Sequence, residues 1–250
     1  MNSQHAPQLS KNPASNEIVI FIHGLMGSPR QFAGLSGVVY RQGYSTAALL
    51  LPGHGSTAKD FVTCGYEQWQ RHVDSEIERL SGEYSGIWLA GHSMGGLLAI
   101  NATTKHAGNI RGILAISCPF KLTTLSAYTI KVRIKQLLSK RDDPIKTAYL
   151  ANSSVAPSAR LILHMRKPAV EVKKLIQVTE ANLPHVCVPL SVVYSKSDEL
   201  TSFTSLEILK AQLAKPLFEE VVLTDSLHAY FPDNEQKMIE QALNNLLSKA

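Results

Sequence analysis

Long apolar runs and paired cysteines are both scarce in this chain of 250 residues. No apolar stretch approaches the roughly eighteen residues that a membrane-spanning helix needs, so we expect no integral membrane segment. The opening residues lack the basic-then-apolar order of a secretory signal, which predicts a cytoplasmic protein. The three cysteines, Cys64, Cys118 and Cys187, are too few and too scattered for a disulfide framework or a zinc site. We therefore expect no metal, no redox chemistry and no cofactor.

The composition is that of a folded globular protein. Hydrophobic residues make up 44% of the chain and charged residues 18%, which excludes disordered, collagen-like and repeat architectures. The length allows one to two domains, and single α/β domains often reach this size. We therefore expect residues 1–250 to form one domain.

Positive charge is concentrated in the middle of the chain. The formal net charge is +5, yet residues 119–185 hold twelve Lys or Arg against four Asp or Glu, so this segment carries +8 and the remainder −3. A solvated, lysine-rich surface is the simpler explanation. The alternative is a docking surface for an acidic carrier or an anionic lipid surface. We expect no nucleic-acid partner.

Short apolar runs alternate with helix-length segments outside the middle of the chain. Six runs read as buried strands: 17–23, 44–51, 86–93, 111–117, 189–195 and 218–224. The last helix begins near Pro232 and places Met238, Ile239, Ala242, Leu243, Leu246 and Leu247 on one face. The alternation predicts an α/β fold with a mostly parallel sheet covered by helices on both faces. In such sheets, ligands bind beyond the carboxyl ends of the strands.

Residues 119–185 interrupt this alternation. They contain no clear strand and two helical patterns, at 122–138 and 168–183. With too few residues for a comfortable core of its own, the segment is expected to be a small helical insertion that packs over the sheet edge.

A candidate nucleophile follows the strand at 86–93. Residues 91–95 read Gly-His-Ser-Met-Gly, between that strand and a segment with helical spacing. In a G-x-S-x-G turn the serine is forced into a strained conformation that exposes its hydroxyl, and the flanking glycines avoid collisions between neighbouring backbones. Ser93 is therefore the expected nucleophile. A glycine-rich turn that merely packs tightly is the alternative.

A serine hydroxyl needs a histidine base, itself oriented by a carboxylate. His228 directly follows the last predicted strand, and Asp198 follows the strand at 189–195. Glu199 is the adjacent rival, whereas Asp225 lies too near His228 in sequence. Among the other histidines, His23, His54 and His92 look like turn-stabilising residues, and the rest have the character of surface or packing residues.

An acyl-transfer site also needs two donors for the oxyanion that forms when the hydroxyl attacks. The backbone amide of Met94, directly after the nucleophile, is one candidate. The second is the amide of Leu25, in the glycine-containing loop after the first predicted strand. A simple turn would use the same glycines.

The segments HGLMGSP, LPGHG, GHSMGG, SKSDEL and DSLH occur in this order. The chain thereby resembles the carboxylesterase and monoacylglycerol-lipase group of α/β hydrolases over nearly its whole length. The resemblance implies a sheet of about six to seven strands, a small helical cap at 119–185 and the roles given above for Ser93, Asp198, His228, Leu25 and Met94. No strand is apparent before residue 17, so we expect the first two strands of the full sheet to be absent.

Three functions are compatible with these residues. The leading hypothesis is a serine esterase acting on short- to medium-chain acyl esters or monoacylglycerols through an acyl-enzyme. A thioesterase or acyl-carrier-protein esterase would use the same three residues, with the basic segment as its docking surface. The third is a binding protein without catalysis, which usually lacks one of the three side chains.

Overall fold

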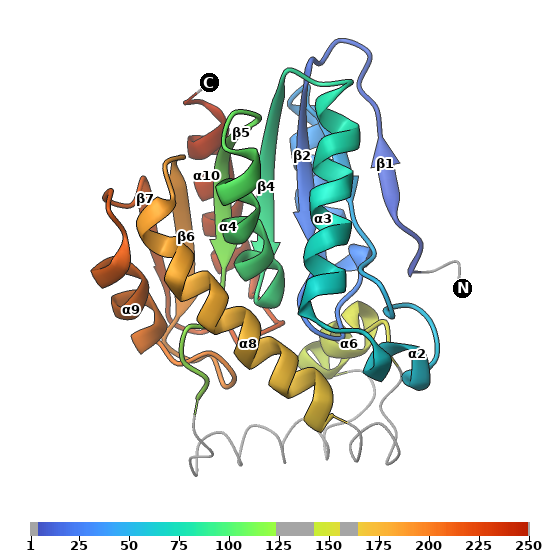
Figure 1. Ribbon diagram of the computed structural model, residues 1–250, viewed down its shortest axis with the longest axis vertical. Helices are drawn as coiled ribbons and strands as arrows, with labels where there is room; N and C mark the ends of the chain where they lie inside the picture. Colours follow the sequence, from blue (N-terminus) through green and yellow to red (C-terminus); the bar gives the residue numbers. More distant parts are fainter. Residues whose placement is uncertain (1–4, 124–142, 156–164, 250) are drawn as a thin grey trace.

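The computed structural model describes residues 5–123, 143–155 and 165–249, in which strands and helices alternate (Figure 1). The strands are β1 (Gln8–Ser10), β2 (Glu17–Ile22), β3 (Ser45–Ala48), β4 (Gly86–His92), β5 (Ile110–Ile116), β6 (Leu190–Ser195) and β7 (Glu219–Leu223). The helices are α1 (Ala33–Arg41), α2 (Ala58–Thr63), α3 (Tyr66–Ser81), α4 (Met94–His106), α6 (Pro144–Asn152), α8 (Arg166–Asn182), α9 (Thr204–Gln212) and α10 (Asp233–Leu247). Two 3-10 helices, η2 (Pro29–Phe32) and η3 (Leu183–His185), complete the described elements.

The seven strands form one sheet in the order β1-β3-β2-β4-β5-β6-β7. Every neighbouring pair from β3 to β7 is parallel. The predicted α/β fold, with a mostly parallel sheet of six to seven strands, is confirmed, and all six predicted strands are present. The second of them is shorter than expected. Because β4 lies near the middle of the sheet, the residues that follow it are surrounded by loops from both sides.

The expectation that no strand precedes residue 17 was wrong. β1 pairs antiparallel with β3 at one edge of the sheet, with Leu9 opposite Ala47. The strand has only three residues, and its one apolar side chain, Leu9, is 45% exposed. Backbone hydrogen bonds rather than burial define it, so the sequence carries no alternating pattern that would reveal it.

Helices cover both faces of the sheet (Figure 1). The helices α3, α4, α8 and α9 contribute to one apolar cluster and α1 and α10 to the other. Along β2, Ile18, Ile20 and Ile22 join the first cluster, whereas Val19 and Phe21 join the second. Because both faces are buried, the strand reads as a continuous apolar run. Among the described helices, none is both long and apolar enough to cross a bilayer.

The last helix follows the prediction with one exception. Ile239, Ala242, Leu243, Leu246 and Leu247 are buried against the sheet. Met238 is 41% exposed, so its predicted place on the buried face was wrong. It precedes Ile239 directly, and successive helical positions differ by about 100° around the axis, which carries it out of the contact.

The described parts of residues 119–185 lie in two places. α8, close to the helix predicted at 168–183, packs against α4 and α3 in the layer that covers the sheet. α6 lies instead beside η2 at the end of the sheet where the site is found (Figure 1). The helix predicted at 122–138 falls largely outside the described residues.

Candidate active site

Ser93 occupies a turn of one residue between a strand and a helix. β4 ends at His92 and α4 begins at Met94. The backbone of Ser93 has φ 54° and ψ −121°, in a region that residues with side chains rarely adopt. Such a conformation costs on the order of 1–3 kcal/mol and persists only where the surrounding structure fixes it. The serine side chain lines a cavity at this end of the sheet.

The two glycines of the motif are required by close backbone contacts. A Cβ atom on Gly91 would lie 2.3 Å from the carbonyl oxygen of Gly95. A Cβ atom on Gly95 would lie 2.0 Å from the carbonyl oxygen of Ile22. Both distances are far inside van der Waals contact, so β4, α4 and β2 meet without room for a side chain. The motif spacing thus follows from the packing around Ser93.

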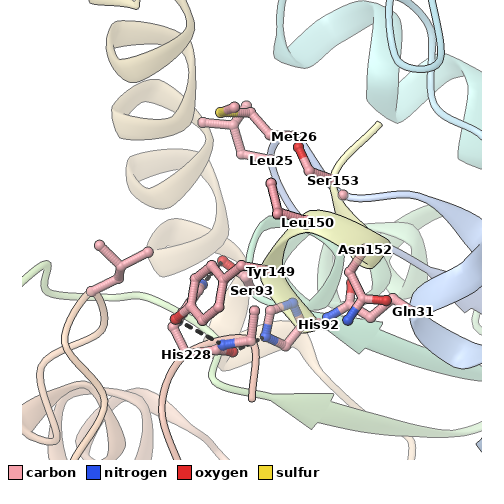
Figure 2. Close-up of a pocket in the computed structure, with 14 residues that line it drawn as sticks. Leu25, Met26, Gln31, His92, Ser93, Tyr149, Leu150, Asn152, Ser153 and His228 are labelled. Atoms are coloured by element: carbon pink, nitrogen blue, oxygen red, sulfur yellow. Dashed lines mark hydrogen bonds between the residues drawn. The ribbon is translucent and has the colours of Figure 1, made fainter. Parts of the chain in front are cut away.

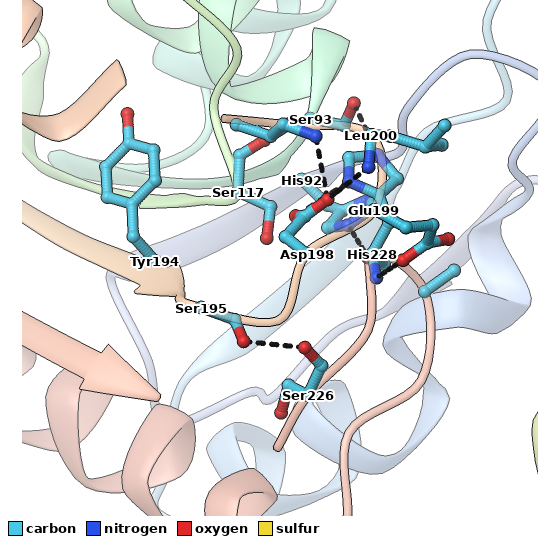
Figure 3. A network of polar contacts seen from close by, with 12 residues as sticks. His92, Ser93, Ser117, Tyr194, Ser195, Asp198, Glu199, Leu200, Ser226 and His228 are labelled. Atoms are coloured by element: carbon cyan, nitrogen blue, oxygen red, sulfur yellow. Dashed lines mark hydrogen bonds and ion pairs between the residues drawn. The ribbon is translucent and has the colours of Figure 1, made fainter. Parts of the chain in front are cut away.

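The structure brings Ser93, Asp198 and His228 together. The Ser93 Oγ lies 2.9 Å from the Nε2 of His228. The Nδ1 of the same ring lies 2.9 and 3.1 Å from the two carboxylate oxygens of Asp198 (Figure 3). In its neutral form the imidazole therefore donates to Asp198 and accepts from Ser93. All three side chains are buried, on loops that follow β4, β6 and β7.

The surroundings keep Asp198 ionised and favour the charged form of His228. Burial opposes ionisation of Asp198, but the nearby imidazole and the N–H groups of Leu200 and Thr201, at 2.8 and 2.7 Å, lower its pKa overall. Burial also opposes the imidazolium, yet Asp198 and then Glu199 raise the pKa of His228 above its ordinary value. The pair is thus arranged to accept a proton from Ser93.

The two other candidate carboxylates, Glu199 and Asp225, do not contact the imidazole ring of His228. One oxygen of Glu199 accepts the backbone N–H of His228 at 2.9 Å, away from the imidazole ring. Asp225 accepts a hydrogen bond from the hydroxyl of Thr224. Among the described carboxylates, Asp198 is the one in contact with the ring nitrogen.

The candidate oxyanion donors lie on two sides of Ser93. Met94 is the first residue of α4, a position whose N–H has no partner within the helix. Leu25 lies in the loop after β2 and lines the cavity. That loop passes close to the serine, since a Cβ atom on Gly24 would lie 3.0 Å from the Cβ of Ser93. Met94 as a whole is 1% exposed, and its side chain packs in the apolar core.

Three buried histidines hold the loops around the site. His23 accepts the backbone N–H of Leu51 at 3.1 Å, and His54 accepts that of Met26 at 3.2 Å. The Nε2 of His92 lies 2.7 Å from the carbonyl oxygen of His228. Burial lowers the pKa of His54 to about 4 and that of His92 to about 3, so these rings are neutral near pH 7.

Glu235 holds the loop that carries His228 and was missed by the sequence reasoning. This buried carboxylate, in the first turn of α10, accepts the backbone N–H groups of Thr224, Asp225 and Ser226 at 2.7, 3.0 and 2.8 Å. It also accepts the hydroxyl of Ser226. Despite burial, these hydrogen bonds lower the pKa of Glu235 to about 2. An acidic residue at a helix start was its one visible signal in the sequence.

Replacing Glu235 with Gln is expected to lower the free energy of unfolding by about 2 kcal/mol at pH 7, because an amide cannot accept every one of these hydrogen bonds. The wild-type advantage is complete above the unfolded pKa of about 4.3 and is lost as the pH falls toward 2. Urea unfolding across this range measures the difference. Asp233→Asn, on an exposed residue of the same turn, is the control; equal stability of Glu235→Gln and wild type at pH 7 would contradict the assignment.

A mainly apolar cavity of about 290 Å³ opens beside Ser93 (Figure 2). Side chains from the loop after β2, from α6 and from the loops that follow β6 and β7 surround it. Its described lining comprises Gly24, Leu25, Met26, Gly27, Gln31, His92, Ser93, Tyr149, Leu150, Asn152, Ser153, Leu200, His228 and Ala229. Gln31, Tyr149 and Asn152 were not predicted, since nothing in the sequence places α6 beside this loop. Among the residues that the structure describes, no three His, Cys, Asp or Glu side chains form a group that could hold a metal ion.

The model of the family described as serine aminopeptidase, S33, matches residues 13–235. The chain belongs to this family. It is therefore a hydrolase with the α/β-hydrolase fold, as the resemblance of its motifs implied, and the hypothesis of a binding protein without catalysis is not retained.

Lipases recur among the relatives of this S33-family chain. It is 23% identical to the thermostable monoacylglycerol lipase of Bacillus sp. (strain H-257) over 225 residues, which cover 88% of this chain and 86% of the lipase. The structure of a Paleococcus ferrophilus monoacylglycerol lipase superimposes with a TM-score of 0.74 at 18% identity, covering 98% of this chain and 99% of the other. A thioesterase domain from the curacin biosynthetic pathway gives 0.63 at 18% identity, covering 95% and 93%. The family and these relatives make the protein a hydrolase of the lipase and esterase kind.

Proposed function

We propose that the protein is a serine esterase that hydrolyses carboxylic esters through an acyl-enzyme intermediate. The observation that carries the proposal is the continuous set of hydrogen bonds from Ser93 through His228 to Asp198 beside an apolar cavity. A serine, a histidine and a carboxylate in this order are the arrangement that makes a serine hydroxyl nucleophilic.

The reaction proceeds in two halves. Ser93 Oγ attacks the ester carbonyl while His228 Nε2 takes the hydroxyl proton, and Asp198 stabilises the imidazolium that results. His228 then returns the proton to the leaving alcohol, which departs as the acyl-enzyme forms. In the second half, water attacks the acyl carbon while His228 takes a proton from it. The bond to Ser93 Oγ then breaks, His228 returns the proton to this oxygen, and the carboxylic acid departs. The amides of Leu25 and Met94 donate to the oxyanion in both halves.

The cavity favours an ester with a small or medium acyl chain and a polar alcohol. Its described lining is mostly apolar, and its volume of about 290 Å³ is at the lower end for small-molecule sites. The side-chain amides of Gln31 and Asn152 also line it, near one another in Figure 2. They would bind the hydroxyl groups of an alcohol such as glycerol. Monoacylglycerols, the substrates named for two of the relatives, fit this combination.

The family description would also suggest a peptide with a free amino terminus as substrate. Recognition of an ammonium group ordinarily requires a carboxylate in the pocket. None of the described residues that line the cavity is Asp or Glu. The lining therefore favours an ester over an aminopeptidase substrate.

The second candidate is a thioesterase, which the same three side chains would serve. The likeness to a thioesterase domain concerns the fold alone. The basic segment at 119–185 would dock an acidic carrier or an anionic lipid surface. Half of its basic residues, including Lys131, Arg133, Lys135, Lys140, Arg141 and Arg160, lie outside the described residues. On α8, Arg166, Lys167, Lys173 and Lys174 are exposed, but Lys174 is paired with Glu171 at 2.8 Å.

A labelling and substrate experiment tests the proposal. A fluorophosphonate is expected to modify the protein once, on the peptide that contains Ser93. The p-nitrophenyl acetate, butyrate, octanoate and laurate esters, each with a matched thioester, then report chain length and bond preference, and an aminoacyl p-nitroanilide reports peptidase activity. We expect the oxygen esters of short and medium chains to be hydrolysed fastest.

Other outcomes have definite meanings. Two results together would favour the thioesterase. The thioesters would be hydrolysed faster than the matched esters, and the rate of hydrolysis of a carrier-linked substrate would fall steeply between low and physiological salt. If the p-nitroanilide were hydrolysed faster than every ester, the protein would be a peptidase and not an esterase. Absence of labelling at Ser93 together with intact activity would overturn the serine mechanism itself.

A further inference from the structure

A set of buried polar contacts joins α6 to the loop of His228. The hydroxyl of Tyr149, on α6, donates to one oxygen of Glu199 in a close contact and accepts the backbone N–H of Ala229 at 3.3 Å. The other oxygen of Glu199 accepts the backbone N–H of His228 at 2.9 Å (Figure 3). We call Tyr149 and Glu199 the tyrosine–glutamate pair. It links the helix that covers the cavity to the residues that present the imidazole.

The carboxylate of Glu199 is buried, so its hydrogen bonds matter for the stability of this part of the site. Glu199 is 2% exposed, and a buried carboxylate is tolerated only when its oxygens have partners. Each oxygen has one here, and both partners belong to elements of the site. The hydroxyl of Tyr149 is already used as donor and as acceptor, so it has no hydrogen left for a substrate. The pair therefore acts on the position of His228 rather than on the ester.

The same segment reaches the opposite side of the site. Just after α6, the backbone N–H of Ser154 donates to the carbonyl oxygen of Met26 at 2.8 Å. Met26 follows Leu25, the candidate oxyanion donor. α6 is thus fixed at one point to the loop of the base and at another to the loop of the oxyanion donor, with the cavity between them (Figure 2).

The charge of Glu199 also favours the imidazolium form of His228, although its carboxylate contacts the backbone of this residue and not the ring. The titratable side chains near His228 in the described residues are Asp198 and Glu199 after β6, His92 at the end of β4, and Tyr149 on α6. His92 is kept neutral by burial, and burial together with Glu199 raises the pKa of Tyr149 far above neutrality. Glu199 is therefore the one negative charge besides Asp198 among these groups.

We propose that Tyr149 and Glu199 are positioning residues of the esterase site: the pair holds the His228 loop against α6, and Glu199 adds a second negative charge that favours the imidazolium formed during the reaction. The inference rests on the proposed function, since it assigns these residues to the base of that mechanism. It also assigns a role to Glu199, which the sequence offered only as a rival of Asp198.

Glu199→Gln tests the charge with little change in geometry. The side-chain carbonyl of glutamine can still accept the N–H of His228, and its NH2 group can donate to the Tyr149 oxygen. Without the negative charge the pKa of His228 falls, so the base stays neutral to lower pH. The acidic limb of the kcat/KM profile is therefore expected to move to lower pH. We expect the ratio of kcat/KM at about pH 5.5 to kcat/KM at about pH 8 to be roughly twofold or more higher in Glu199→Gln than in wild type.

Tyr149→Phe tests the positioning while leaving the charge. The ring still lines the cavity, but Ala229 and Glu199 each lose a hydrogen-bond partner, and the His228 loop is less well held. Because small displacements of a catalytic group are costly, kcat for p-nitrophenyl butyrate should fall between about 10- and 100-fold. KM should stay within about twofold, since the ring keeps its contacts with the substrate.

Two surface variants serve as matched controls. Glu207→Gln changes an exposed glutamate on α9, and Tyr40→Phe changes a 40% exposed tyrosine on α1; both should match wild type in kcat and in the pH profile. Thermal unfolding of each variant shows whether it is folded. Tyr149→Phe, which removes a single oxygen, decides the question if Glu199→Gln does not fold.

The proposal is overturned if folded Tyr149→Phe retains the wild-type kcat, or if the acidic limb of folded Glu199→Gln coincides with that of wild type. Either result leaves the proposed function untouched as long as replacement of Ser93 abolishes turnover. Full activity without the Ser93 hydroxyl would instead remove the esterase mechanism, whatever the two variants show.

Discussion

Replacement of Ser93 with alanine is expected to lower kcat for p-nitrophenyl butyrate by about 10⁶-fold, the loss seen when a serine hydrolase is deprived of its nucleophile. The hydroxyl contacts His228 at 2.9 Å, whereas the hydroxyl of Ser153, the other serine in the described lining, donates to the carbonyl oxygen of Val155. The residual rate should resemble that supported by the oxyanion donors and substrate binding alone.

The fold should survive this change. Alanine takes the same backbone conformation as serine at similar cost, and the substitution removes one oxygen from a site that already borders a cavity. The thermal midpoint is therefore expected to stay within a few degrees of wild type.

Ser117 provides a matched control for the Ser93 variant. It is also a buried serine with positive φ, 49°, directly after the neighbouring strand β5. Ser117→Ala should keep kcat within about threefold of wild type, because none of the hydrogen bonds described for Ser93, Asp198 and His228 involves the Ser117 hydroxyl. If Ser93→Ala hydrolysed the ester at more than a few percent of the wild-type rate, the nucleophile would have to be another group.

Among glycine-to-alanine substitutions in the turn around Ser93, Gly95→Ala is expected to cause the largest loss in the free energy of unfolding. The new Cβ would stand 2.0 Å from the carbonyl oxygen of Ile22 and 2.8 Å from that of His23. Both contacts are with backbone, which cannot rotate away as a side chain can. Relief requires α4 to move off β2, at a cost of about 3 kcal/mol or more in the free energy of unfolding.

Gly108→Ala is the control for this overlap. It lies in the turn after α4, and a Cβ atom there would meet nothing within 4 Å. Since its φ is not in the left-handed range, alanine should leave stability unchanged or raise it slightly through the unfolded state. Urea unfolding of the two variants separates steric overlap from the general effect of replacing glycine, and equal stabilities would mean that α4 and β2 can part at little cost.

The sequence predicted the elements that are defined by burial and the loops that follow them. Strands buried on both faces read as apolar runs, so β4 and β6 were found. β7 is mostly half-buried, and its short run of Val221, Val222 and Leu223 revealed it. These strands gave the places of Ser93, Asp198 and His228. The pattern also ranked Asp198 ahead of Glu199 because it comes sooner after β6. The structure places Asp198 against the ring and Glu199 against the backbone of the same histidine.

What the sequence did not reveal depends on contacts between distant segments. β1 is held by backbone pairing and carries no apolar alternation. Tyr149 reaches Glu199 across fifty positions, and Glu235 acts on a loop about ten residues before it. None of these contacts leaves a local pattern, because backbone pairing and the hydrogen bonds of polar side chains place no constraint on hydrophobic periodicity.

The hydrogen bond from Ser93 to His228 joins residues separated by 135 positions, and the two strands that precede them are not neighbours in the sheet. The nucleophile gains its base only after β5 and β6 have docked and the last strand has closed the far side. Ester hydrolysis would therefore be the last native property to emerge during refolding, later than helical signal or tryptophan burial, because contacts of long sequence separation form slowly. A nascent chain in which His228 has not yet been synthesised therefore carries a serine without its base.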